Sequence, residues 1–203
     1  VKKEENLDIT VNKNLYEDDS LKIMSFGDLN VSKGDKDISK KDWKGKKVKL
    51  LFIYLLLNKT GVNREQIYQN LFPEGDKSSS AMYVMFNRLR TALSVLSDDT
   101  SIIHFSSELY SFNFSIDYTW DASNMEYLIN LAKKNNDNKD KYKKLEEALD
   151  LYKDHFMKGF ELENWVVSTQ EYYRNLAYKS FEELSEYYYN EKEYDKLLNL
   201  SDK

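Results

Sequence analysis

The spacing of hydrophobic residues changes along the chain and predicts regions of different structure. Between residues 21 and 38, apolar and polar residues nearly alternate on either side of Gly27-Asp28, which predicts two short antiparallel strands joined by a turn. Gly34-Asp35 and the following Ile38 predict another turn and strand. Residues 1–20 are polar and predict a tail or linker, with at most a short strand around Ile9.

Three helices are predicted next. The first covers about 46–58 and ends before Gly61, and the second covers about 63–71, with Asn63 and Gln66 at the spacing of a capping box. The segment 72–77 contains the only proline of the chain and predicts a loop. A third helix is predicted from the serines at 78–80 to Leu96, because apolar residues recur at spacings of three and four. They share one predicted buried face: Met82, Met85, Phe86, Leu89, Leu93 and Leu96.

A β-hairpin is predicted after the third helix, and only helices follow it. Its strands are predicted at 102–105 and 110–114, with a turn at 106–109. Beyond Trp120, helices are predicted near 122–134, 141–156, 162–190 and 193–201, with loops at 135–138 and around Gly159. These helices are rich in tyrosine and resemble stacked helical hairpins, although no repeat of about 34 residues recurs cleanly.

This order of elements predicts two domains after the tail at 1–20. Residues 21–118 match an α+β winged helix-turn-helix, in which a trihelical core presents its third helix to the DNA major groove and a hairpin follows. Residues 119–203 match an all-α, TPR-like helical domain, which we expect to be truncated because the chain stops inside a helical pattern.

Charge and composition narrow the function. The net charge is −5, but residues 21–118 carry 14 Lys and Arg against 11 Asp and Glu, whereas residues 119–203 carry 13 against 18. This distribution fits a DNA-binding domain attached to one that does not touch DNA. The longest apolar run, 50–57, is far shorter than the roughly 20 residues that span a bilayer, so we expect a soluble, cytoplasmic protein without a membrane partner.

The sequence offers little for catalysis. It has no cysteine, which excludes disulfides, thiolate metal sites and thiol nucleophiles. His104 and His155 fall in a predicted strand and a distant helix, and no phosphate-binding, dinucleotide-binding, serine-hydrolase or zinc-protease motif is present. We therefore expect no enzymatic activity, no metal site and no cofactor.

The outward side of the third predicted helix is the candidate DNA-binding surface. No acidic residue occurs from Ser78 to Ser97, so no carboxylate would repel phosphate there. Arg88 and Arg90 could donate bidentate hydrogen bonds to guanine, although arginines on a helix can equally serve only to solvate it. Lys44 and Lys46 stand at the start of the first helix, where backbone N–H groups favour phosphate. The outward-facing set comprises Ser79, Ser80, Tyr83, Asn87, Arg88, Arg90 and Thr91.

Residues 49–96 resemble the winged-helix domain of OmpR/PhoB-type transcriptional regulators. The resemblance rests on Lys49–Leu51 with Leu55–Leu57, on Val62–Ile67 and Leu71–Pro73, and above all on Met82–Leu93, which ends in Arg-Leu-Arg-x-Ala-Leu. The stretches 118–125, 147–156, 159–160, 165 and 170–176 are similar to a bacterial transcriptional activator domain. The two halves in this order resemble activators of the SARP class over residues 21–200.

The resemblance implies that the chain binds double-stranded promoter DNA and RNA polymerase and that it self-associates on DNA. It implies that the outward residues of the third helix, together with Arg64, contact DNA. It also implies that the loop Pro73, Glu74, Gly75, Asp76 and Lys77 touches RNA polymerase, and that the wing, with Ser106, Ser107 and Tyr110, approaches the minor groove. The family wing is generally richer in arginine, whereas this one carries Glu108 and no cation. We therefore expect DNA binding by this chain to rely on dimerisation or on repeated sites in the DNA.

A second hypothesis is that the chain is an interaction adaptor whose winged helix does not bind DNA. The acidic, tyrosine-rich half would then carry the function, with Trp165, Tyr172 and Tyr173 lining a groove. The alternative for these aromatic residues is packing inside the helical hairpins. The carboxylate-free third helix favours DNA binding, since an adaptor has no need of it.

Overall fold

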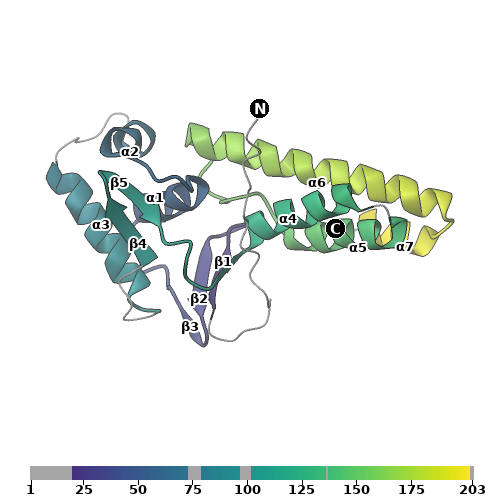
Figure 1. Cartoon of the computed structure of the whole chain (residues 1–203), viewed down its shortest axis with the longest axis horizontal. Coiled ribbons are helices and arrows are strands. Elements are labelled where there is room, and N and C mark those ends of the chain that lie inside the picture. The colour runs from purple at the N-terminus through teal and green to yellow at the C-terminus, as the bar shows by residue number, and fades with distance from the viewer. Residues whose placement is uncertain (1–19, 73–78, 97–101, 136, 202–203) are drawn as a thin grey trace, which may run out of the picture.

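The computed structural model describes residues 20–72, 79–96, 102–135 and 137–201 (Figure 1). The predicted strand around Ile9 and the loop 73–77 lie outside these residues. The first half contains β1 (Leu21–Met24), β2 (Asn30–Lys33), β3 (Lys36–Asp37), α1 (Lys46–Leu57), α2 (Arg64–Leu71), α3 (Ser79–Leu93), β4 (Ile103–Ser106) and β5 (Leu109–Phe112). The rest contains β6 (Tyr118–Trp120), α4 (Asp121–Lys134), α5 (Asn138–Leu151), α6 (Asn164–Asn190) and α7 (Tyr194–Ser201).

A four-stranded sheet with the order β3-β2-β1-β6 forms one layer. β1 and β2 are antiparallel, with Ile23 opposite Val31, as the alternation around Gly27 predicts. β6 was not predicted, and it pairs in parallel with β1, with Ile23 opposite Trp120. One edge strand of the sheet therefore comes from residues nearly a hundred positions away from β1, at the junction of the two halves.

The three helices of the first half surround a common core. α1 is almost entirely buried from Leu50 to Leu56, which explains the long apolar run. Asn63 and Gln66 form the predicted capping box at the start of α2. α3 ends at Leu93, three residues before the predicted end, although Leu96 is still buried in the turn that follows.

The helical half consists of the paired helices α4 and α5, followed by α6 and the short α7. In Figure 1, α6 extends along the molecule from above α1 to the far end, where α7 lies beside it. The helix predicted at 141–156 was wrong at both ends, since α5 covers Asn138–Leu151. The residues after Tyr152 instead form bends and turns around an isolated β-bridge between Phe156 and Phe26. Gly27 N–H donates to the His155 carbonyl and Met157 N–H donates to the Ser25 carbonyl, so this segment is tied to the β1–β2 turn.

Asp121 links the two halves at the first residue of α4. Its carboxylate accepts hydrogen bonds from the backbone N–H groups of Ser25 (2.7 Å), Phe26 (2.9 Å) and Ala122 (2.7 Å) and from the Ser25 hydroxyl (2.7 Å). Trp120 Nε1 donates to the same hydroxyl. Burial raises the pKa of Asp121, although the hydrogen bonds that its carboxylate accepts from Ser25, Phe26 and Ala122 lower it.

Aromatic residues complete the junction between the halves. The ring of Phe26 packs edge-on against Tyr152 and Tyr173, with centroids 5.0 and 5.3 Å apart, and Tyr54 of α1 packs against Trp165 of α6 at 5.4 Å. Trp165 and Tyr173 therefore contact the first half of the chain, and they do not form the groove considered for the adaptor hypothesis. The two halves pack as one body with a continuous core.

Candidate nucleic-acid interface

The outward face of α3 is open to solvent along its length. Tyr83 is 69% exposed, and Asn87 and Thr91, four and eight residues on, are exposed on the same side of the helix. The Thr91 hydroxyl donates to the backbone carbonyl of Asn87, one turn earlier in the helix. The opposite face, with Met82, Phe86 and Leu89, is buried as the periodicity predicts.

Arg88 and Arg90 flank this face on two different sides. Two residues along an α-helix turn the side-chain direction by about 200°. Arg90 is half-buried, with its guanidinium 5.9 Å from the centre of the Phe86 ring, on the side of the wing. Arg88 is exposed and lines a cavity on the side of α1. We predicted that both arginines face solvent, and the structure bears this out for Arg88 alone.

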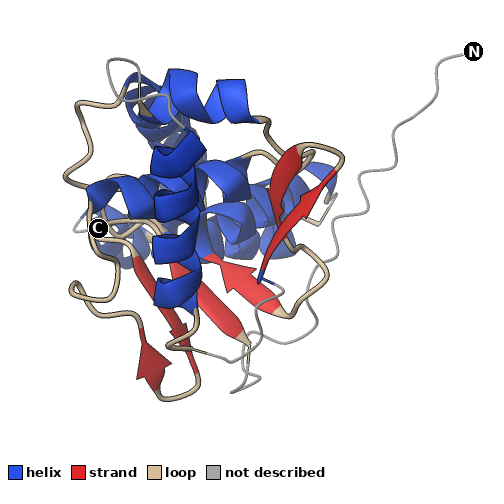
Figure 2. Cartoon of the chain, turned by 90° about the vertical axis from the view of Figure 1, so that its left-hand side faces the viewer, coloured by secondary structure: helices blue, strands red, loops and turns tan. Residues whose placement is uncertain are grey.

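The wing is the hairpin β4–β5, which Figure 2 shows as a pair of strands separate from the sheet. Its turn is Ser107-Glu108, two residues shorter than predicted, and both have positive φ angles of 50° and 64°. Ser106 and Ser107 are exposed at the tip. The Tyr110 ring lies between Phe86 of α3 at 4.1 Å and Phe105 at 4.4 Å, so Tyr110 holds the wing against α3.

Gly61 fixes the wing from the other side. Its φ is 84°, and a Cβ built there would lie 3.2 Å from the Leu109 Cβ and 3.3 Å from the Tyr110 carbonyl oxygen. The next residue, Val62, exchanges backbone hydrogen bonds with Tyr110.

Gly61→Ala is therefore expected to lower the free energy of unfolding by about 1–3 kcal/mol. Urea denaturation checks this; Thr60→Ala, at an exposed neighbour, should change it by under about 0.5 kcal/mol. Equal values for the two variants would contradict it.

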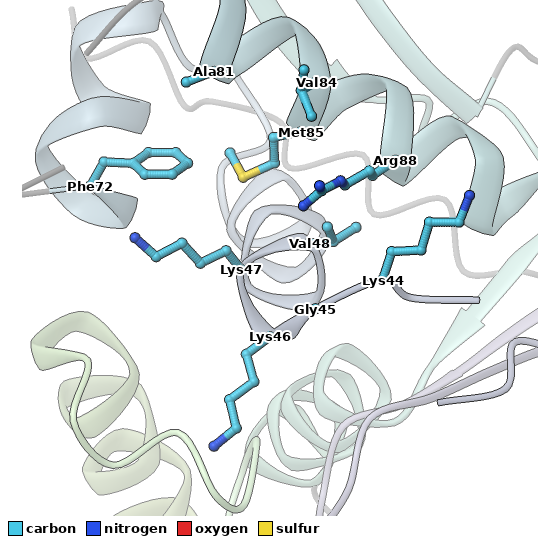
Figure 3. Close-up of a pocket in the computed structure, with 10 residues that line it drawn as sticks. All are labelled: Lys44, Gly45, Lys46, Lys47, Val48, Phe72, Ala81, Val84, Met85 and Arg88. Atoms are coloured by element: carbon cyan, nitrogen blue, oxygen red, sulfur yellow. The ribbon is translucent and has the colours of Figure 1, made fainter. Parts of the chain in front are cut away.

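Three lysines near the start of α1 differ in where they point. Lys44 has a positive φ of 49° and precedes Gly45, and it lies beside the cavity (Figure 3). Lys47 Nζ lies 4.3 Å from the centre of the Phe72 ring. Lys46, also predicted to contact DNA, is among the residues that line the cavity, but its side chain points away from it in Figure 3, with Nζ 5.8 Å from the Phe160 ring of the helical half.

The remaining predicted residues are distributed around this surface. Arg64 is the exposed first residue of α2, and Ser80 is exposed in the first turn of α3. Ser79 begins α3, but its side chain is outside the described part. Pro73, Glu74, Gly75, Asp76 and Lys77, the predicted polymerase-contact loop, lie outside the described residues.

Two features of the site were missed in the sequence. Phe105 alternates as a core residue would, yet it is 57% exposed at the outer end of the ring stack. The cavity between α1, Phe72 and α3 could not be predicted, because it depends on how the helices approach one another.

Among the described residues, no group of three or more His, Cys, Asp or Glu is placed to hold a metal ion. Within the same ranges, no helix is both long and apolar enough to cross a membrane.

A similar fold occurs in EmbR of Mycobacterium tuberculosis, whose structure is that of a complex with a low-affinity phosphopeptide. The TM-score is 0.65 at 13% sequence identity, and the match covers 83% of this chain and 45% of EmbR. No protein-family model and no curated protein matches the sequence. At this identity the likeness shows the fold alone. The chain therefore has a fold like that part of EmbR, in which a small sheet region is combined with several helices.

Proposed function

We propose that the chain is a sequence-specific, DNA-binding transcriptional regulator that inserts α3 into the major groove of promoter DNA. The observation that carries this proposal is the exposed, carboxylate-free face of α3, with an arginine on each flank and the wing beside it. A helix about 10–12 Å across fits a groove about 12 Å wide. Tyr83 and Asn87, at the centre of the face, would then meet base edges.

The partners follow from the same reading. The acidic helical half would remain outside the DNA and support self-association on repeated half-sites, which compensates for a wing without cations. The loop 73–77 would contact RNA polymerase, so that the regulator acts as an activator in the cytoplasm. The fold shared with EmbR supports this assignment, at the level of fold alone.

Selection of bound fragments from a random duplex pool, with the purified chain at two salt concentrations, tests the proposal. We expect an enriched, repeated motif, and affinity that falls steeply with salt. Absence of enrichment at both concentrations would contradict sequence-specific binding and favour the adaptor hypothesis.

Asn87 gives a residue-level prediction. An Asn amide recognises adenine through two hydrogen bonds, worth about 1–3 kcal/mol of discrimination. Asn87→Ala is therefore expected to weaken binding to the selected motif by about tenfold or more and to relax the preference at one base pair, with little effect on a scrambled duplex. Thr91→Ala, beside it on the same face, should have a smaller effect, since its hydroxyl is already used within the helix. Retention of the full preference by Asn87→Ala would exclude it from base recognition.

A further inference from the structure

A cavity of about 270 Å³ lies between the start of α1, the end of α2 and the flank of α3 (Figure 3). Its floor is apolar, with Val48, Phe72, Val84 and Met85 among the lining residues. Arg88 extends into it from α3, and Lys44 and Lys47 border it from α1 and the residues before α1. Three cationic side chains, from α3, from α1 and from the residues before α1, therefore border one small cavity.

These three cations have no anionic partner in the described part of the chain. Among the described residues, no Asp or Glu lines the cavity and no ion pair involves Lys44, Lys47 or Arg88. By contrast, lysines of the helical half, such as Lys141, Lys144 and Lys158, do pair with carboxylates. An anion in the cavity would be attracted by all three charges.

We propose that this cavity binds a phosphate group, with Arg88 as its principal ligand. The planar guanidinium of arginine can donate two parallel hydrogen bonds to phosphate oxygens, and each lysine ammonium adds a point charge. Backbone N–H groups at the start of α1 are further donors, since Gly45 offers no side-chain cap and the first turn has no acidic residue. The apolar floor excludes water from one side and strengthens these contacts.

The position on α3 indicates where the phosphate comes from. The cavity lies on the flank opposite the wing, so with α3 in the major groove it would meet the sugar–phosphate backbone on one side of the groove. The assignment of the phosphate to the DNA backbone rests on the proposed function. It assigns Arg88 to the DNA backbone, whereas the sequence alone suggested a contact with a guanine edge. The same phosphate chemistry could come instead from a free phosphorylated solute.

The experiment has a DNA arm and a solute arm, using the full chain. In the first, wild type and Arg88→Ala, Arg88→Lys, Lys47→Ala and Lys179→Ala are titrated with the selected duplex and a scrambled duplex over a salt series. Lys179 is an exposed lysine of α6 and controls for loss of a charge. In the second, wild type and Arg88→Ala are titrated with inorganic pyrophosphate while the amide signals of α1 and α3 are followed by NMR. Thermal unfolding confirms that each variant is folded.

We expect Arg88→Ala to weaken binding to both duplexes by the same factor, about tenfold, and to reduce the slope of log affinity against log salt by about 0.9. Arg88→Lys should keep the slope, and Lys179→Ala should match wild type. Selective loss of the motif alone, with an unchanged slope, would overturn the proposal by making Arg88 a base contact.

If the chain binds no duplex, the proposed function fails, and the solute arm decides the phosphate site separately. Signal shifts near Val48 and Val84 that disappear in Arg88→Ala would then support a site for a free phosphate. The absence of both duplex binding and pyrophosphate shifts would overturn it.

Discussion

Asp121→Ala is expected to lower the free energy of unfolding by about 3 kcal/mol. The carboxylate is only 3% exposed and accepts four hydrogen bonds, three of them from groups in the β1–β2 turn. Alanine would leave the buried N–H groups of Ser25 and Phe26 without an acceptor, and each such group costs about 1–3 kcal/mol. Because the turn is also paired with 155–158, loss of its anchor loosens the junction of the two halves.

Urea denaturation monitored by circular dichroism measures this loss. Asp121→Asn keeps one acceptor oxygen but places an NH₂ group against backbone donors, so it should fall between wild type and alanine. Asp37→Ala, at an exposed position of β3, is the control and should stay within about 0.5 kcal/mol. A loss below about 1 kcal/mol for Asp121→Ala would show that the carboxylate does not hold the junction.

The parts of the fold that depend on local pattern were predictable from the sequence. The periodicity of α3, the capping box of Asn63 and the β1–β2 turn at Gly27 each arise from residues a few positions apart. The pairing of β6 with β1 was not predictable in this way, since Leu21 meets Tyr118 only when the chain is folded. The shortening of α5 has the same origin, because the backbone of 155–158 gains hydrogen bonds to the β1–β2 turn that outweigh its helical pattern.

In the candidate site, too, the features that depend on local sequence were predictable and those that depend on helix packing were not. Helical periodicity places Tyr83 and Asn87 on an outward face, and the absence of acidic residues is visible in the sequence. Which lysine faces α3 is not visible there. Lys46 and Lys47 are neighbours in sequence, yet one lies over Phe160 and the other over Phe72 at the cavity, because α1 is packed between α3 and the helical half.

The double variant Arg88→Ala/Arg90→Ala is expected to lose about 100-fold or more of its affinity for the selected duplex. An arginine contact with a base edge is worth about 1–3 kcal/mol, or roughly 5- to 150-fold in affinity, and the phosphate contact proposed for Arg88 is expected to be worth about tenfold. The two side chains leave α3 in directions about 200° apart and share no partner within the described residues, so their contributions should add. Arg90 also packs over Phe86, but this contact is at the surface of the core and its loss should leave the fold intact.

Fluorescence anisotropy with the selected duplex at fixed salt measures the loss. Lys153→Ala/Lys179→Ala removes two exposed lysines from the helical half and matches the change in net charge. If the loss came only from net charge, both double variants would weaken binding equally. Because α3 is expected to lie in the groove while the helical half stays outside it, only the arginine variant should fall by 100-fold. Wild-type affinity in the arginine variant would mean that α3 is not the recognition helix, and the adaptor hypothesis would then be the better account of the chain.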